Sequence, residues 1–217
     1  MFKDLLNEIL VFLKSKTIDS LIPPILFVSL DSLFNLNIAI IFSIAFSILI
    51  LFYRIIRKEN VVYALIGFSM LSFASLLAVL TNNPNSYFLP DLITNVILVL
   101  LSAILLIIKK PLAAYASHLM RAWPLEWYLR DDIRPAYTEV SIFWLIFFIF
   151  KTGAQIMIIF YSNLVLLNLF LGIPFTIIVV GISYIYGLIR LKQLHGPSIN
   201  EFKHNKPAPW KSQTKGF

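Results

Sequence analysis

One lysine in this sequence, Lys151, lies in the middle of a long apolar stretch and is its most suggestive chemical group. Counted from Val140, where the stretch begins, Lys151 lies about 16 Å along a helix, close to the centre of a bilayer. An ammonium group at that depth is costly unless it faces protein or water. We therefore expect Lys151 to have a polar partner inside the protein.

Four side chains are predicted to form a buried polar cluster around this lysine. Gln155 lies one helical turn after Lys151, on the same face of the helix. Asp31 and Asp91 are the acidic residues inside apolar stretches, and Asp31 is the better partner because side chains tilt toward the amino terminus of their helix. Asn95 reaches a similar depth. The predicted cluster therefore consists of Lys151, Gln155, Asp31 and Asn95.

This cluster has two interpretations. In the first, it binds or relays a small polar or anionic solute, because ionisable residues inside a membrane usually mark a functional site. In the second, it is an ion pair that fixes the register of the helices and meets no ligand. The sequence favours the first only slightly.

A second group of residues mixes aromatic rings with basic side chains between two apolar stretches. Its members are Trp123, Trp127, Arg130 and Arg134. Arginine binds phosphate through two parallel hydrogen bonds, so this group could recognise a lipid headgroup. The alternative, favoured by composition, is an anchor at the membrane interface. The neighbouring carboxylates of Asp131 and Asp132 are equally good partners for the two arginines.

The remaining sequence offers no catalytic centre and no cofactor or metal site. It contains no cysteine, and its three histidines are scattered without the spacing of metal ligands. Phosphate-binding glycine loops, zinc-protease motifs and dinucleotide fingerprints are also absent. We therefore expect a protein that is not an enzyme and that needs neither a metal nor a cofactor.

The composition indicates a protein embedded in a bilayer. Hydrophobic residues make up 59% of the 217 residues and charged residues 13%, whereas soluble domains carry about 25% charged residues. The net charge of +7 comes from short basic clusters between apolar runs, which suit anionic lipid headgroups better than nucleic acid. Protein partners, or a second copy of the chain, are further expected contacts.

The elements expected to position these residues form an all-α membrane bundle of about six spans. Residues 1–17 form an amphipathic helix at the membrane interface. The membrane domain covers residues 18–190, with a cytoplasmic interfacial segment at 111–139 and an exposed turn at 81–86, and residues 191–217 form a basic, disordered tail. The predicted spans are 18–34, 38–56, 61–80, 88–108, 140–160 and 164–189.

Basic residues predict the orientation of these spans. Of the 18 Lys and Arg residues, all except Lys151 fall in the two ends and in alternate connections of the six-span topology. Basic residues beside membrane spans are retained in the cytoplasm. Both ends of the chain are therefore expected in the cytoplasm.

Short motifs along the second half of the chain carry a family resemblance. They comprise Phe88, Leu89, Pro90, Leu92, Thr94 and Asn95; Lys110, Pro111 and Leu112; Arg130, Asp132, Arg134, Ala136, Tyr137, Thr138 and Trp144; Lys151 and Gln155; and Leu171, Gly172, Ile173 and Pro174. In this order they resemble the domain-of-unknown-function 3159 membrane family, and more loosely the intracellular septation protein A group. The resemblance implies a multi-span protein of the bacterial inner membrane, with no assigned activity and a loose link to envelope assembly.

Two functions therefore remain open. The chain is either a small transporter or solute- or lipid-binding membrane protein that uses the Lys151 cluster, or a non-catalytic assembly or envelope-organising protein that binds protein or lipid partners. An enzyme acting on lipids ranks third because no acid, base or nucleophile constellation faces the headgroups.

Overall fold

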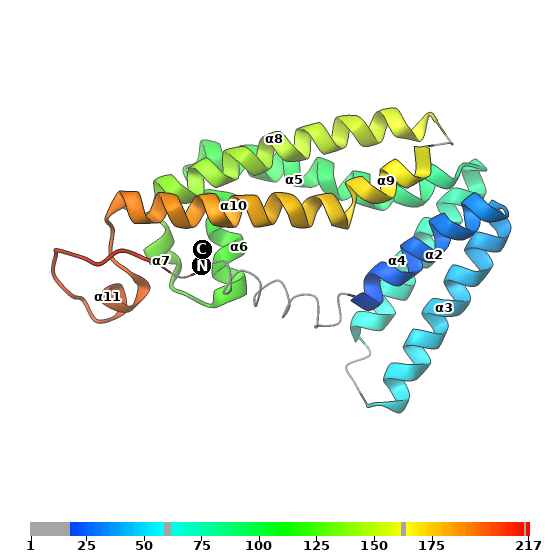
Figure 1. Ribbon diagram of the computed structural model, residues 1–217, viewed down its shortest axis with the longest axis horizontal. Coiled ribbons are helices and arrows are strands. Elements are labelled where there is room, and N and C mark those ends of the chain that lie inside the picture. The colour runs from blue at the N-terminus through cyan, green and yellow to red at the C-terminus, as the bar shows by residue number, and fades with distance from the viewer. Residues whose placement is uncertain (1–17, 59–61, 162–163, 215) are drawn as a thin grey trace. The chain divides into compact units, whose positions relative to one another are not determined.

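The computed structural model describes residues 18–58, 62–161, 164–214 and 216–217, and every regular element in these ranges is helical. The chain forms two compact units. The first unit comprises the described parts of Met1–Thr94 and Gly153–Phe175; the second comprises those of Asn95–Thr152 and Thr176–Phe217. The helices α5 (Leu89–Ile107), α8 (Arg134–Ile159) and α10 (Ile173–Leu194) contribute residues to both units (Figure 1).

Three apolar helices form most of the first unit (Figure 1). They are α2 (Ile18–Leu33), α3 (Leu36–Ile56) and α4 (Val62–Thr81), and both α2 and α4 pack against α3. The residues buried on α3 and α4 are mostly small, among them Ser43 on α3 and Ala78 on α4. Small side chains let helices approach closely in lipid, where no hydrophobic force drives them together.

The connection after α4 is part of the core of the first unit. It contains the 3-10 helix η2 (Pro84–Phe88), which packs against α4 and against the short helix α9 (Val165–Leu171). The Tyr87 ring stacks on Phe27 of α2 with 4.0 Å between ring centroids. The exposed turn predicted at 81–86 is therefore wrong for Asn85 and Ser86, which are buried.

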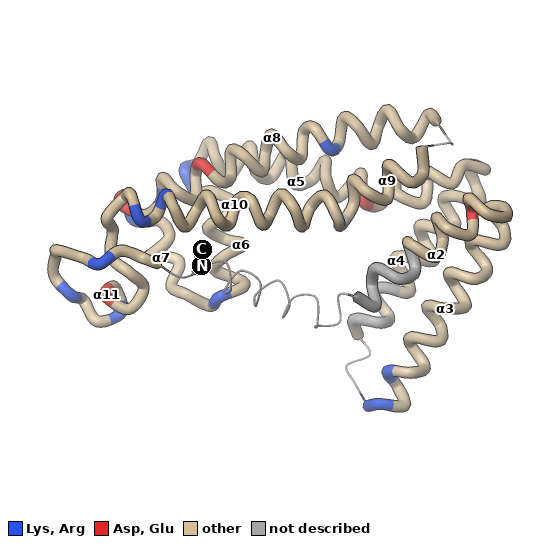
Figure 2. The backbone as a smooth tube through the Cα atoms, viewed as in Figure 1, with Lys and Arg blue, Asp and Glu red and all other residues tan. Residues whose placement is uncertain are grey.

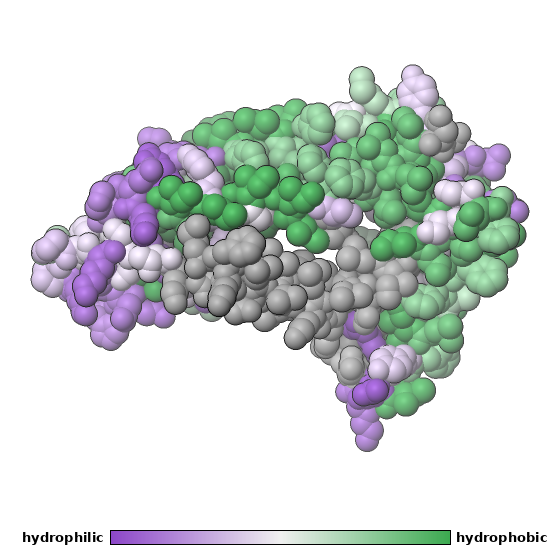
Figure 3. All heavy atoms as spheres, in the orientation of Figure 1, coloured by the Kyte–Doolittle hydropathy of each residue, from purple (hydrophilic) through white to green (hydrophobic). Residues whose placement is uncertain are grey.

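The second unit has an aromatic core at the end where α8 begins and α10 ends. The helices α6 (Leu112–Arg121), α7 (Leu125–Tyr128) and α11 (Ile199–Lys203) gather there (Figure 1). The buried residues of this core are Ala113, Ala114, Trp127, Tyr128, Ile133, Ala136, Tyr137, Val140, Leu188, Leu191 and Phe217. Lys and Arg residues cluster at this end (Figure 2), and hydrophilic residues cover the surface around α11 (Figure 3).

Several helices end at residues with a left-handed backbone. Asn82, Lys109, Ala122 and His195 have φ values of 48°, 57°, 52° and 54°, just after α4, α5, α6 and α10. A left-handed residue closes a helix because the next amides can bond back to its last carbonyls. Prolines at 84, 111, 124 and 197 come shortly after these residues and prevent each helix from resuming.

Four helical segments among the described residues are long and apolar enough to cross a membrane. They are Leu36–Ile56, Pro84–Ile107, Arg134–Ile159 and Val165–Leu194. This confirms the all-α fold and its apolar helices. The helices α2 and α4 coincide with predicted spans, but α2 has only 16 residues, so the number six stays a prediction. The amphipathic helix predicted at 1–17 lies outside the described residues.

Candidate functional site

Two polar side chains of α8, Lys151 and Gln155, are buried although most of their neighbours are apolar. The exposed fraction is 4% for Lys151 and 1% for Gln155. Gln155 comes four positions after Lys151, so the two lie one turn apart on the same side of the helix. The division between the two units falls between them, with Lys151 in the second unit and Gln155 in the first.

In the first unit, Gln155 joins three elements through hydrogen bonds. Its Nε2 donates to Oδ2 of Asp91, near the start of α5, over 2.8 Å. The same nitrogen lies 3.4 Å from Oδ1 of Asn168 on α9, which is a long hydrogen bond. We call Asp91, Gln155 and Asn168 the amide cluster.

Asn168 is the least satisfied member of the amide cluster. Its side chain is fully buried, and its Nδ2 has no hydrogen-bond partner among the described residues. Leaving a buried amide donor without an acceptor costs about 1–3 kcal/mol. The hydroxyls of Tyr128 and Tyr137 in the second unit also have no partner in the described chain. For those tyrosines the burial of a large ring offsets the cost, whereas an asparagine buries almost no apolar surface.

The helix that carries Asn168 is interrupted just after it. Residues 165–194 are broken into α9 and α10 at Gly172, whose amide donates to the carbonyl of Asn168 over 3.2 Å. Pro174 has no amide hydrogen and so cannot make the usual helical bond to the preceding turn. A Cβ atom at Gly172 would lie only 3.1 Å from the carbonyl oxygen of Leu169. The tight backbone at this break therefore favours glycine.

The sequence predicts Asp31 as the acidic partner of Lys151, and the structure has Asp91 bonded to Gln155. Asp31 of α2 makes no hydrogen bond or ion pair with any described residue, and Asp91, the second choice from the sequence, bonds to Gln155. Asn95 is 3% exposed and lies one turn after Asp91 on α5, in the second unit. A coupling between Lys151 and Asp31 stays a prediction that a double-mutant cycle would test.

Two asparagines that the sequence interpretation missed cap the end of α8 in the first unit. Asn83 Nδ2 donates to the carbonyl of Ile159 over 2.8 Å. Asn85 Nδ2 donates to the carbonyls of Ile158, over 3.2 Å, and Tyr161, over 2.7 Å. The last carbonyls of any helix lack partners within it, and these amides supply them. The two asparagines around Pro84 were the available signal, because side-chain amides imitate backbone groups.

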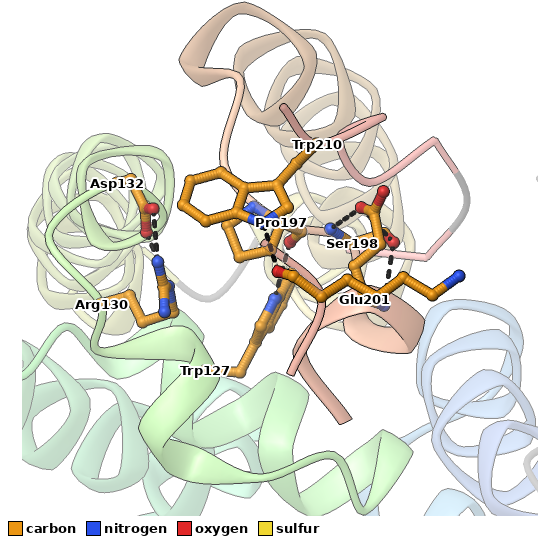
Figure 4. A network of polar contacts seen from close by, with 8 residues as sticks. Trp127, Arg130, Asp132, Pro197, Ser198, Glu201 and Trp210 are labelled. Carbon is orange, nitrogen blue, oxygen red and sulfur yellow. Dashed lines mark hydrogen bonds and ion pairs between the residues drawn. The ribbon is translucent and has the colours of Figure 1, made fainter. Parts of the chain in front are cut away.

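In the second unit, Trp127 and Trp123 do not lie free at a surface. Trp127 is fully buried, and its Nε1 donates to the carbonyl of Pro197 over 2.9 Å (Figure 4). Trp123 is partly buried and packs edge-on against Trp127. Burial raises the pKa of the neighbouring Tyr128 to about 12. These rings therefore form a core in which little surface is left for a ligand.

Arg130 is also occupied within the protein. Its Nε and Nη2 donate to the two carboxylate oxygens of Asp132 over 2.9 and 2.7 Å (Figure 4). The guanidinium also lies 5.8 Å from the ring centroid of Phe202 and 5.3 Å from that of Trp210. The hydrogen bonds to Asp132 raise the pKa of Arg130. Arg130 therefore serves mainly to hold the tail, and a phosphate would have to displace Asp132.

The tail is more ordered than its composition indicates. The prediction for residues 191–217 is disorder, yet Glu201 and Ser198 form a capping box that starts α11. Hydrogen bonds from the Ser198 hydroxyl and from the amides of Lys211 and Ser198 lower the pKa of Glu201 below its ordinary value of 4.5. Phe217 stacks on Tyr137 with 4.3 Å between centroids. Aromatic contacts and caps thus compensate for the polar composition.

Arg134 lies at the first turn of α8, and its side chain is 33% exposed, about as much as that of Arg130 at 32%. Its Nη2 donates to Asp131 over 2.7 Å, but the Asp131 side chain is 91% exposed. Nearby, Glu139 accepts from Arg190 over 2.9 Å and from the Tyr186 hydroxyl over 2.7 Å. Among the described residues, no group of three or more His, Cys, Asp or Glu is placed to hold a metal ion.

Comparison with known proteins supports the family resemblance. The model of one family, Protein of unknown function (DUF3159), matches residues 14–193. No curated protein matches the chain, and no solved structure does. The looser similarity to the septation protein A group stays a prediction. The matched region contains the amide cluster, Lys151, Arg130 and Arg134, and extends over most of the 217 residues. The chain belongs to the DUF3159 family, and its apolar helices are consistent with an integral membrane protein.

Proposed function

We propose that this membrane protein binds a small polar solute at the amide cluster, as a solute-binding protein or small transporter. The observation that carries the proposal is the buried Asn168 amide, which has no acceptor in the described chain, beside the 2.8 Å bond between Gln155 and Asp91. A cluster that served only to hold helices together would gain most by satisfying every donor. The unsatisfied amide instead suits a site that is completed by a bound molecule.

The chemistry of the cluster indicates the class of solute. Asn168 supplies an N–H donor, so the solute should present a carbonyl, carboxylate or hydroxyl oxygen. Asp91 supplies carboxylate oxygens, which accept hydrogen bonds from a hydroxyl, amide or amine. A small molecule with both an acceptor and a donor meets these requirements.

The broken helix supports the same proposal. In many transporters, solutes bind where a membrane helix is interrupted, because the interruption frees backbone groups from helical hydrogen bonds. Here Gly172 and Pro174 interrupt the helix within one or two turns of Asn168. The unsatisfied amide and the interruption are separate observations, and both lie in residues 165–175 of the first unit.

A thermal-shift experiment on the full chain in detergent tests the proposal. Acetate, acetamide and glycine provide acceptors, whereas ethylammonium provides only donors. We expect at least one of the first three to raise the melting temperature, as a solute that binds only the folded state must, and ethylammonium to have no effect. Asn168→Leu should abolish the shift while changing the basal stability by less than about 1 kcal/mol, because the donor it removes has no partner in the described chain and the acceptor it removes makes only the long 3.4 Å bond to Gln155.

Thr94→Val is the matched control for this experiment. Thr94 lies on α5 beyond Asp91, and its hydroxyl donates to the carbonyl of Pro90 over 2.8 Å. This variant should retain the full shift. The cluster is structural if Asn168→Leu lowers the free energy of unfolding by several kcal/mol, or if none of the acceptor probes raises the melting temperature. The alternative of a non-catalytic assembly protein would then be favoured.

The proposal includes an orientation in the bacterial plasma membrane with both ends of the chain in the cytoplasm. It is supported by the distribution of basic residues: apart from Lys151, they lie in the ends, in alternate connections or, for Arg54, in the last turn of the helix before such a connection. Since the sequence has no cysteine, single cysteines can be introduced directly. We expect Tyr161→Cys to react with an impermeant reagent added outside cells, and Lys58→Cys and Lys206→Cys to stay unreacted. The opposite pattern would reverse the orientation.

A further inference from the structure

The second unit carries a surface groove between the end of α5 and the start of α8. Its volume is about 320 Å³. Two of the residues that line it are basic, two are apolar and two are a threonine and a glutamate: Lys109, Arg134, Leu106, Pro135, Thr138 and Glu139. The amide cluster contributes nothing to this groove, so a ligand could bind here whether or not a solute binds at the amide cluster.

The groove has a net positive character. Glu139 is already engaged by Arg190 and by the Tyr186 hydroxyl. The Thr138 hydroxyl donates to the carbonyl of Arg134 over 3.0 Å. Asp131, the partner of Arg134, is almost fully exposed, and an ion pair in such a position contributes little. Lys109 and Arg134 are therefore the side chains that an incoming anion would meet.

Apolar surface continues from the groove along α8. Ile142 lies four residues after Thr138, and Ile146 another four residues on; their exposed fractions are 45% and 61%. Ile107, at the end of α5, is 80% exposed. Because side chains four residues apart lie above one another on a helix, the isoleucines of α8 form an apolar track that leads away from the two basic residues.

We propose that this groove binds one anionic phospholipid, with its phosphate at Lys109 and Arg134 and an acyl chain along Ile142 and Ile146. The guanidinium of Arg134 can hold two phosphate oxygens at once, and the ammonium of Lys109 adds a second charge from the end of α5. A free phosphate would use the cations but gain nothing from the apolar track. The combination of charge and track therefore selects a lipid.

Native mass spectrometry of the full chain, released from detergent, tests the assignment. The protein is titrated with phosphatidylglycerol, with phosphatidylcholine of the same acyl chains, and with inorganic phosphate. We expect the first bound phosphatidylglycerol to be held about tenfold more tightly than phosphatidylcholine. Replacing both cations, by Lys109→Gln with Arg134→Gln, should remove that preference. The matched control is Lys110→Gln, which removes an adjacent exposed charge that does not line the groove.

A second variant keeps the test decisive if the double replacement folds poorly. Asp131→Asn removes a negative charge beside Arg134 and so raises the positive potential at the groove, which should tighten phosphatidylglycerol binding several-fold. The proposal is overturned if Asp131→Asn has no effect, or if Lys110→Gln weakens binding as much as the groove variants do. It is also overturned if inorganic phosphate displaces the first lipid, since the site would then recognise the anion alone.

Discussion

The two units differ in the groups that join their helices. The first unit joins its helices through the buried side-chain amides of Asn85, Gln155 and Asn168, and it leaves the Asn168 nitrogen without an acceptor in the described chain. The second unit also buries polar side chains, among them Lys151 and Asn95, but its core contains packed aromatic rings and its ion pairs lie near the surface, as in Arg130–Asp132 and Arg190–Glu139. If the proposed function holds, the second unit is a scaffold and the first holds the solute site.

The strongest test of the scaffold is Trp127→Ala. Trp127 is fully buried and bonded to Pro197, so its loss leaves a large cavity and an unpaired carbonyl. We expect a destabilisation of about 3–5 kcal/mol, measured by thermal unfolding in detergent. Trp210→Ala should cost clearly less because that ring is only partly buried. Equal losses for the two tryptophans would contradict the assignment of Trp127 to the core.

Asn85→Ala tests whether amides in the first unit also have structural roles. The change removes both hydrogen bonds that this fully buried side chain gives to the end of α8. We expect a loss of about 2 kcal/mol in unfolding free energy because two carbonyls lose their donor. Asn37→Ala, at an exposed position of α3, is the control and should be neutral. A neutral Asn85→Ala would mean that water caps α8.

Gly187→Ala and Gly181→Ala test whether Phe217 packs on α10. A Cβ atom at Gly187 would overlap the ring of Phe217, whereas one at Gly181 has no described neighbour within 4 Å. Alanine should therefore stabilise the helix by about 0.5–1 kcal/mol at position 181 but not at 187. A spin label on residue 214 should become more mobile only in Gly187→Ala. Similar mobility in both variants would show that Phe217 does not pack on α10.

The smallest expected effect is a response of the tail to acid. Folding lowers the pKa of Glu201, so its stabilising contribution is present above the ordinary value of 4.5 and is lost as the pH falls through the lower, folded value. A fluorophore on Lys206→Cys should report a docked tail at neutral pH and a looser one below about pH 4. Glu201→Gln should weaken this pH dependence, and an unchanged profile would assign the transition to other carboxylates.

Hydropathy was sufficient to locate most of the helices but not the way they end. Predicted spans 38–56, 61–80 and 88–108 agree within one or two residues with α3, α4 and α5. The helix predicted at 140–160 begins instead at Arg134, because its first turns are polar and carry no hydropathy signal. A break within the last span depends on one glycine and one proline, and averaging over an apolar window hides it.

The candidate site was only partly predictable for a related reason. Burial of Lys151, Gln155 and Asn95 is expected for polar residues inside apolar helices, and the structure has all three buried. The bonds from Gln155 to Asp91 and Asn168 depend on which helices become neighbours, which one chain's local pattern does not reveal. The order of the tail was not predictable from its polar composition, because it depends on a few aromatic contacts, those of Phe217 with Tyr137 and of Trp210 with Arg130.

The amides that cap α8 have a consequence for how the protein tolerates membranes of different thickness. A helix end with open carbonyls must reach water, so a thick bilayer would strain it. The end of α8 draws its donors from Asn83 and Asn85 and therefore carries its own substitute for hydration. We expect this end to sink below the headgroups at little cost, which would make the first unit insensitive to hydrophobic mismatch at that end.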